Sequence, residues 1–455
     1  MRSLLGLIVL SLSYAAMGGA YLWALGATPT WLRLLRYGGL AYLTGLGLCG
    51  VAWTTLLVLG VPFTGFTVVG VIVFLAAVAV ALGRRLGRAL PEGRPTLPAP
   101  GLALAVTATG IAATAVFYEA LFRAGRLQGL QSYDGWAFWI PKAKAIFLFH
   151  GLDEQFFALL PGRSYPPLVP AVDAAAFHAM GGIDVVTLHL QFWVIALALG
   201  WAVGGLLTEL VPGWLAWPFI VLSLVAPRVG DRLLIPQADT VVYAFVVPSA
   251  LLLARWLREP RRRHLVVAAV LLAAAANTKR EGLLLAGVLL AAAGIGTLDR
   301  VRRSWPALAA VGLVVVAAAL PWRIWFATKD MTGEGPSGGA LGPGGRLWPS
   351  IRLAVGAFFD STLWSLLATA VAAALILGLL TRRRRAALFL GSFLALGLLS
   401  AAWIVWIYPE IPLTTEESTN PLVRYLVALV LSSAAIAPIV LADVWRETAP
   451  DEAPK

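Results

Sequence analysis

Residues Phe66 to Leu82 read FTVVGVIVFLAAVAVAL, a stretch without a single charged side chain. A run of this length can form an α-helix that crosses most of the roughly 30 Å hydrocarbon core of a bilayer. A strand of a transmembrane β-barrel would instead alternate between polar and apolar residues over about 10 positions. The stretch therefore predicts a membrane-spanning helix.

The rest of the chain has the same character. Of its 455 residues, 60% are hydrophobic and only 13% are charged, whereas soluble proteins are about half apolar and one quarter charged. This composition excludes a soluble enzyme and predicts an all-α, polytopic transmembrane protein with about 13 membrane helices. The expected helices lie near residues 4–25, 38–60, 66–83, 101–122, 186–207, 214–227, 238–256, 265–276, 283–298, 307–322, 353–380, 386–407 and 422–441.

The cysteine and histidine content and the net charge limit the kinds of chemistry that we expect of the chain. The single cysteine, Cys49, lies within an apolar run, and the four histidines show no metal-binding spacing. We therefore expect no disulfide, no thiol chemistry and no metal site built from His or Cys. A divalent cation such as Mg²⁺ or Mn²⁺ stays open as a cofactor. The net charge of +12 does not predict nucleic-acid binding, because basic residues of membrane proteins collect in cytoplasmic loops.

The basic residues also predict the orientation of the chain. More than half of the 35 Lys and Arg residues fall in every second loop between the expected helices. These loops share one side of the membrane, which marks that side as cytoplasmic. The opposite side carries the long loops, including residues 123–185. We expect a multi-pass protein of the cell (inner) membrane whose functional site faces the periplasm or the extracellular space. The basic clusters lie at residues 33–36, 84–94, 255–263, 300–303, 382–385 and 446–455.

The long loop 123–185 contains two unusual segments. Residues Trp136 to Phe149 read WAFWIPKAKAIFLF, in which Lys142 and Lys144 interrupt aromatic and aliphatic residues. This pattern predicts an amphipathic helix that lies along the outer membrane surface. Tyr165-Pro166-Pro167 follows, and proline restricts the residue before it to extended geometry. We expect an ordered loop that folds back toward the membrane.

Two aspartates near this outer side are candidates for chemistry. Asp134 lies in Ser132-Tyr133-Asp134-Gly135-Trp136, directly before the amphipathic segment, and Asp239 stands at the start of an expected helix. Each has a plain structural alternative, because aspartate is favoured as a cap at a helix N-terminus. The sequence leaves both interpretations open.

Cations follow at two outer positions. Asn277 to Gly282 reads NTKREG and separates two apolar runs, with Lys279, Arg280 and Glu281 at its centre. It could be an ordinary turn, but charged residues at membrane depth are usually functional. Arg424 begins the last expected helix, where its side chain could simply extend to the membrane interface.

These motifs, in this order, resemble the polyprenyl-phosphate-sugar-dependent glycosyltransferases of the GT-C superfamily. The resemblance rests on Tyr133-Asp134, the segment 136–149, Tyr165-Pro166-Pro167, Ala238-Asp239 and Thr278 to Gly282. It is similar in layout to bacterial relatives of protein mannosyltransferases and of enzymes that add sugars to lipid A. It divides the chain into N-terminal helices (1–100), a catalytic core (101–425) with a long first outer loop, and a last helix with a cytoplasmic tail (426–455).

The resemblance implies transfer of a sugar from a polyprenyl-phosphate donor to a glycan, lipid or protein acceptor at the outer face of the membrane, with inversion at the anomeric carbon. The alternatives are an O-antigen ligase or polymerase, and a transporter or lipid flippase. Transporters often carry internal repeats, and the two halves of this chain show no self-similarity. The expected roles are general base for Asp134, with Asp239 as the second catalytic carboxylate; phosphate binding for Lys142, Lys279, Arg280 and Arg424; and substrate positioning for Tyr133, Trp136, Tyr165 and Glu281.

Overall fold

The structure is a computed structural model of the whole chain. It contains helices, and the described residues include no strand; their one β-type contact is an isolated bridge between Thr30 and Glu92. An all-helical fold is therefore confirmed for this part of the chain. The residues described are 2–92, 101–126, 132–233, 235, 237–329, 331, 342–382, 384–408, 410–415 and 421–448.

The helices follow one another with short connections. The first half contains α1 (Arg2–Ala24), α2 (Trp31–Arg36), α3 (Gly38–Val58), α4 (Gly65–Arg85), α5 (Leu102–Gly125), the π-helix η1 (Gly135–Trp139), α6 (Ile140–Phe149), α7 (Glu154–Leu159), α8 (Leu168–Met180), α9 (Val185–Leu210) and α10 (Gly213–Val225). The second half contains α11 (Pro227–Leu233), α12 (Ala238–Arg258), α13 (Arg262–Thr278), α14 (Arg280–Ile295), η2 (Leu298–Arg300), α15 (Val301–Thr328), η3 (Gly344–Arg346), α16 (Leu347–Phe359), α17 (Ser361–Trp364), α18 (Leu367–Leu379), α19 (Arg385–Ile407) and α20 (Pro421–Thr448).

Among the described residues, nine helices are long and apolar enough to cross a membrane: α1, α3, α4, α5, α9, α12, α15, α19 and α20. The pair α10 and α11, bent by 71°, brings the number to ten if it counts as one span. A polytopic helical protein is thus supported, with fewer full-length spans than the sequence predicted. One expected span, 353–380, is wrong as a single helix. It is divided into α16, α17 and α18, with a cap by Asp360 on Thr362 and a positive φ of 53° at Ser365.

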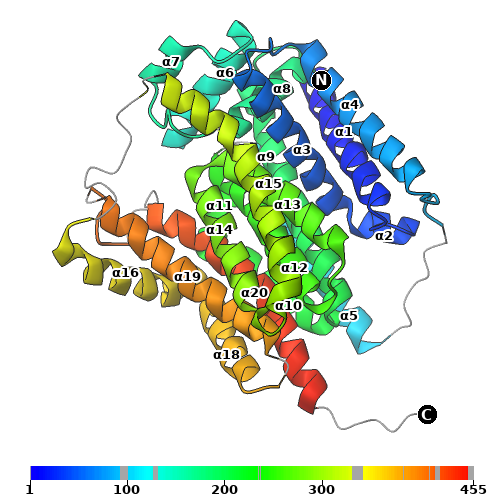
Figure 1. Ribbon diagram of the computed structural model, residues 1–455, viewed down its shortest axis with the longest axis vertical. Coiled ribbons are helices and arrows are strands. Elements are labelled where there is room, and N and C mark those ends of the chain that lie inside the picture. Colours follow the sequence, from blue (N-terminus) through cyan, green and yellow to red (C-terminus); the bar gives the residue numbers. More distant parts are fainter. Residues whose placement is uncertain are drawn as a thin grey trace.

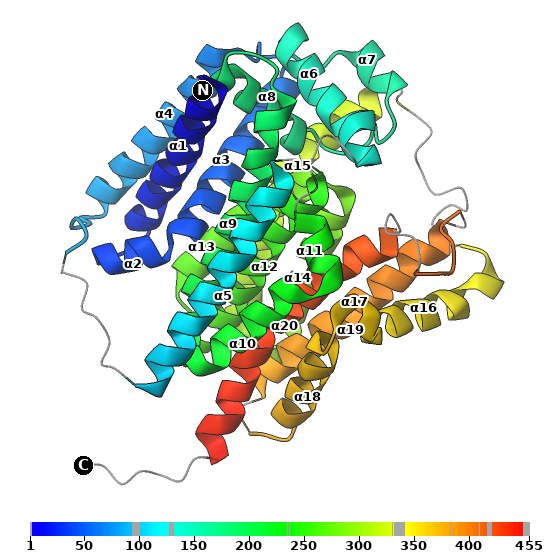
Figure 2. The ribbon, with the colours of Figure 1, turned by 180° about the vertical axis from the view of Figure 1, so that it is seen from behind.

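Helices α12 and α20 form the centre of the bundle, and nearly all of their residues are buried. Helices α9, α13, α14 and α19 pack around them, while α1, α3 and α4 form a group on one side (Figure 1). Figure 2 shows α5 crossing the opposite face beside α9 and α10. Because α3 packs against α9 and α13, the predicted N-terminal segment 1–100 is in direct contact with the predicted core.

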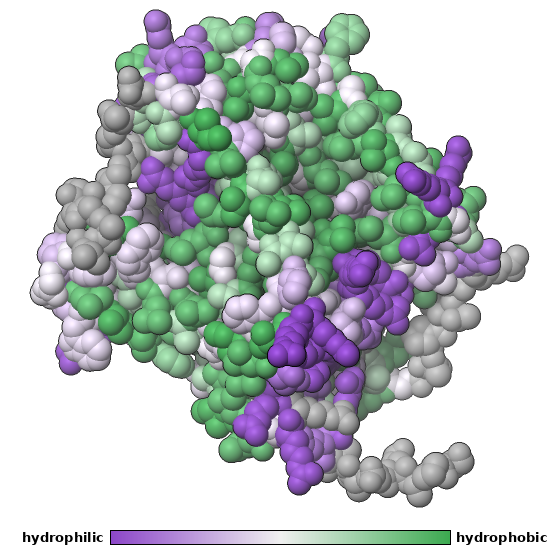
Figure 3. Space-filling view, viewed as in Figure 1, coloured by the Kyte–Doolittle hydropathy of each residue, from purple (hydrophilic) through white to green (hydrophobic). Residues whose placement is uncertain are grey.

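The outer faces of several helices are apolar, as contact with lipid requires. Large exposed residues on α1, α4, α5 and α15 include Leu5, Phe66, Val116 and Leu313. Figure 3 shows this hydrophobic surface across the middle of the molecule, with hydrophilic side chains gathered toward the lower end.

The predicted alternation of the loops agrees with the packing. Arg33 and Arg255 meet at Glu209, Arg258 meets Asp443, and Arg385 meets Asp299. Distant basic loops therefore converge at one end of the bundle. On α12, Asp239 stands in the first turn and Arg255 in the last, so the two lie roughly 24 Å apart at 1.5 Å per residue. We call these the aspartate end and the arginine end.

Candidate functional site

Asp134 lies directly before η1, at the start of the segment (η1, α6, α7 and α8) that connects α5 to α9. The sequence predicted one amphipathic helix over 136–149, but the structure has the π-helix η1 followed by α6. Isolated π-helical turns are rare and occur often at functional sites. The segment formed by η1 and α6 is also more buried than a helix on the membrane surface would be. Trp136, Leu148 and Phe149 are exposed, whereas Trp139, Ile140 and Lys142 are fully buried against the protein.

Four distant segments meet in one network of ion pairs, which we call the Arg424 cluster. Arg424 in the first turn of α20 donates to Oδ2 of Asp134, and its Nε donates to Oδ2 of Asp239 at 2.5 Å. Lys279, between α13 and α14, donates through Nζ to Oδ1 of Asp239 at 2.9 Å. The same Nζ lies 3.1 Å from Oε1 of Glu281. The cluster therefore holds three carboxylates and two cations.

The structural alternatives for the aspartates do not hold. Asp134 precedes η1 without making a side-chain capping bond. Both oxygens of Asp239 accept from cations instead of from the backbone of α12. Arg424 is directed at these carboxylates and its side chain is only 10% exposed, so it does not extend to the interface.

Local backbone geometry explains the NTKREG segment. Lys279 is extended (φ −156°, ψ 160°) and separates α13 from α14. A Cβ on Gly282 would lie 2.0 Å from the carbonyl oxygen of Ala275, so only glycine allows this close return of the chain. Asn277 donates through Nδ2 to the carbonyl oxygens of Ala273 and Ala318. It thus ties the end of α13 to α15, and the segment is more than an ordinary turn.

A large cavity opens beside the cluster, with a volume of about 1610 Å³. Charged residues from the sequence prediction, Asp134, Arg280, Glu281 and Arg424, line its polar end together with Arg323. The remainder is a mostly apolar groove between α14 and α19. Figure 3 shows a hydrophilic recess at the left of the molecule, above α16 and α19. The groove is lined by Leu283, Leu284, Gly287, Val288 and Ala291 of α14 and by Leu396, Ser400, Trp403, Ile404 and Ile407 of α19.

Tyr165 connects the loop after α7 to the cluster. The Nζ of Lys279 lies 5.5 Å from the centre of its ring, and Trp139 stacks on it at 5.5 Å. Burial raises the pKa of Tyr165 to about 12, with a smaller contribution from the negative charge of Glu281. The phenol is therefore protonated at neutral pH. Trp322 fixes the loop by donating to the carbonyl oxygen of Ser164 at 3.1 Å.

Five predicted site residues, Asp239 among them, do not line the cavity. Lys142 is buried and donates to the carbonyl oxygen of Gly162 at 2.5 Å, within 6 Å of three aromatic rings. Lys142 therefore stabilises the loop that contains Gly162 and does not face a substrate. Tyr133 and Trp136 are exposed and pack edge to face with ring centres 5.2 Å apart. Lys279 is also absent from the cavity wall, because it is enclosed by Asp239 and Glu281.

Arg323 on α15 is a cavity residue that the sequence prediction missed. It lines the polar end and lies within electrostatic range of Arg280. Arg280 donates to the hydroxyl oxygen of Tyr408 at 3.2 Å. Within the described part of the chain, Arg323 forms no ion pair. An arginine flanked by Trp322 and Ile324 near the end of an apolar run was the available signal, since charge at membrane depth is costly.

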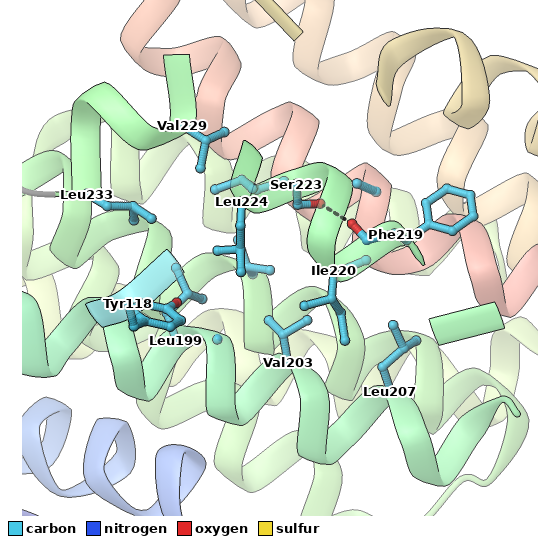
Figure 4. Close-up of a pocket in the computed structure, with 15 residues that line it drawn as sticks. Tyr118, Leu199, Val203, Leu207, Phe219, Ile220, Ser223, Leu224, Val229 and Leu233 are labelled. Atoms are coloured by element: carbon cyan, nitrogen blue, oxygen red, sulfur yellow. Dashed lines mark hydrogen bonds between the residues drawn. The ribbon is translucent and has the colours of Figure 1, made fainter. Parts of the chain in front are cut away.

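A much smaller cavity, of about 40 Å³, lies among α5, α9, α10, α11, α12 and α20 (Figure 4). Its polar groups are satisfied within the protein. Ser223 donates to the carbonyl oxygen of Phe219 at 2.7 Å, and Tyr118 donates to that of Ala196 at 2.7 Å. Since its other lining residues are apolar, it is a gap in core packing and offers no chemistry.

The described residues contain no group of three or more His, Cys, Asp or Glu side chains arranged to hold a metal ion. In the Arg424 cluster, both oxygens of Asp239 and Oδ2 of Asp134 accept from Arg424 and Lys279.

No protein-family model matches the sequence, no curated protein matches it, and no solved structure matches it. The function is thus inferred from the chemistry of this site and from the motifs that resemble the GT-C superfamily.

Proposed function

We propose that this protein is an integral membrane glycosyltransferase that moves a sugar from a polyprenyl-phosphate donor to an acceptor at the aspartate end. The observation that carries the proposal is the cavity, which joins a charged end to an apolar groove. A polyprenyl-phosphate sugar has the same division, with a polar headgroup and a long apolar tail. A groove open between membrane helices suits such a substrate, because its tail cannot leave the bilayer.

The aspartate best placed to act as general base is Asp134. Its Oδ2 is held by Arg424, whereas Oδ1 has no hydrogen-bond partner among the described residues. In the proposed step, an acceptor hydroxyl oxygen forms a bond to the anomeric carbon of the sugar. The bond from that carbon to the phosphate oxygen breaks, and the hydroxyl proton passes to Asp134. Asp239 has both oxygens engaged by cations and is better suited to positioning Arg424.

The leaving polyprenyl phosphate gains one negative charge in this step, so cations near the phosphate stabilise the transition state. Arg280, Arg323 and Arg424 line the polar end of the cavity. Guanidinium groups can bind phosphate oxygens in pairs of parallel hydrogen bonds. We assign the phosphate to these three arginines and give Lys279 a supporting role, because it holds Asp239 and Glu281.

The test uses purified protein in lipid nanodiscs with a panel of polyprenyl-phosphate sugars labelled in the sugar. A membrane extract supplies candidate lipid, glycan and protein acceptors. We expect the wild type to release polyprenyl phosphate from one donor class and to transfer label to an acceptor. Asp134→Asn should lower this rate by about 10² or more, because the amide cannot accept the proton. The melting temperature of this variant should change little, because Arg424 keeps Asp239 as a buried counterion.

Asp153→Asn is the matched control. Asp153 is another carboxylate at the aspartate end, where it caps α7 by accepting from the backbone N–H of Phe156 at 2.7 Å. Asparagine caps a helix about as well as aspartate, so this variant should keep wild-type turnover. Two results would overturn the proposal: full activity in Asp134→Asn, or movement of the intact lipid across the bilayer without cleavage, which would indicate a flippase.

A further inference from the structure

A second large cavity lies at the arginine end and is separate from the proposed catalytic site. Its volume is about 840 Å³. It lies where α12 and α14 end, α19 begins and the last turns of α20 pass. Because these helices include candidate membrane spans, their ends mark the level at which lipid headgroups lie.

The carboxylates in the wall of this cavity already have cationic partners. Oε2 of Glu209 is 2.6 Å from Arg33 and 2.7 Å from Arg255. Arg258 binds Asp443 at 2.5 Å, and Arg385 pairs with Asp299. Glu259 lies 3.5 Å from Arg261. None of these negative charges is left to balance another cation.

Three further arginines face the same cavity: Arg382, Arg384 and Arg446. Among the described residues, none of their guanidinium groups forms an ion pair with a carboxylate. The backbone N–H of Arg382 donates to Glu447, and Arg446 has only a long contact, 3.5 Å, with the carbonyl oxygen of Leu210. The cavity therefore has an excess of positive charge after its ion pairs are counted.

Apolar residues complete the wall, namely Leu257, Ile295, Leu298 and Leu388. A soluble anion would gain nothing from these contacts, whereas an amphiphile would bury its first methylene groups against them. Basic pockets between membrane helices commonly bind anionic lipid headgroups. We infer that this cavity binds the phosphate headgroup of an anionic phospholipid, held by Arg382, Arg384 and Arg446.

The test is native mass spectrometry of the full-length protein, delipidated in detergent and titrated with phosphatidylglycerol. The double variant Arg384→Gln/Arg446→Gln removes two of the unpaired cations. It should bind this lipid about tenfold more weakly or worse, as expected for the loss of charge-assisted hydrogen bonds. The control, Arg302→Gln/Arg303→Gln, removes the same charge from exposed positions on α15 outside the cavity. It should bind within about twofold of wild type, because charges in contact with solvent are screened.

Further titrations separate the sources of the phosphate group. Phosphatidylcholine at the same concentration should bind at least about tenfold more weakly than phosphatidylglycerol, and inorganic phosphate should not displace the bound lipid. Equal binding of both lipids, equal loss in the two double variants, or displacement by inorganic phosphate would each overturn the inference. Circular dichroism and melting temperature are measured for both variants, and the comparison uses protein with the wild-type values. If only the cavity variant loses its fold, Arg384→Lys/Arg446→Lys replaces it. This variant keeps the charge and should bind the lipid, so loss of binding in it would also overturn the inference.

Discussion

Two buried ion-pair clusters stand at opposite ends of α12, and they are built from the same kinds of residue. The Arg424 cluster combines three carboxylates with two cations beside a large amphipathic cavity. The second, which we call the Glu209 cluster, surrounds one carboxylate with Arg33, Arg255 and the hydroxyl of Tyr37. Its members come from α2, α9, α12 and Tyr37, which lies between α2 and α3, so the cluster ties these parts of the chain together.

The two clusters differ in which kind of charge is in excess. Oε2 of Glu209 accepts three hydrogen bonds, all from donors within the protein. The role of this carboxylate is therefore structural. In the Arg424 cluster, carboxylates outnumber cations, and Asp134 faces the cavity. Buried charge alone therefore does not identify a site. An accessible carboxylate with spare hydrogen-bonding capacity does, and the two clusters should respond differently to mutation.

The largest expected effect is on stability, from Glu209→Gln. Neutralising this carboxylate leaves the buried Arg255 and the partly buried Arg33 without their counterion. Removal of one partner from a buried ion pair costs about 3 to 5 kcal/mol. The free energy of unfolding, measured by denaturation in detergent micelles, should fall by that amount.

Glu119→Gln is the control for this stability effect. Glu119 pairs with Arg123 on the exposed face of α5, where ion pairs contribute about 1 kcal/mol or less. Folded Glu209→Gln protein should retain wild-type sugar transfer. An unchanged free energy of unfolding in Glu209→Gln would contradict a structural role for the Glu209 cluster.

The next effect concerns sugar-donor binding at the other end. Arg323→Gln removes a cavity-lining cation that has no ion-pair partner among the described residues. If Arg323 binds the phosphate, affinity for the polyprenyl-phosphate sugar should fall by about 1.5 to 3 kcal/mol, as measured by ligand titration.

Stability should not fall in Arg323→Gln, because no internal pair is broken. Arg126→Gln, an exposed arginine at the end of α5, should bind the sugar donor normally. Equal affinity in wild type and Arg323→Gln would remove Arg323 from the phosphate site.

The smallest effect is expected in the apolar groove. Gly287 lines it, and a Cβ at this position would meet nothing within 4 Å. Gly287→Leu should place a side chain where the polyprenyl tail would lie. We expect the KM for a long-chain sugar donor to rise about tenfold, equivalent to about 1.4 kcal/mol, with a smaller rise for a short-chain analogue.

Gly70→Leu on α4 tests whether any added leucine has this effect. Gly70 is also exposed, with nothing within 4 Å of a Cβ, but it faces away from the cavity wall. Its KM should not change. An equal rise in KM in both variants, or no rise in Gly287→Leu, would contradict the assignment of the lipid tail to the groove.

Sequence and structure agree where the signal is local. The apolar run at 66–82 became α4, and the basic loops gathered at one end. Lys142 shows the limit of such patterns. Its position in an amphipathic stretch predicted a cation facing substrate, yet the chain folds Gly162 against it and buries it. Arg323 shows the reverse, since only packing brings it to the cavity.

The sequence by itself determined that the chain is a bundle of apolar helices with two chemically different ends, because run length and loop charge are local properties. Only the tertiary structure decided that Asp134 would meet Arg424, which lies 290 residues further along the chain. It also decided that α14 and α19 would leave a groove beside them. Contacts across such separations depend on how helices pack against one another, and no local pattern of residues specifies that packing.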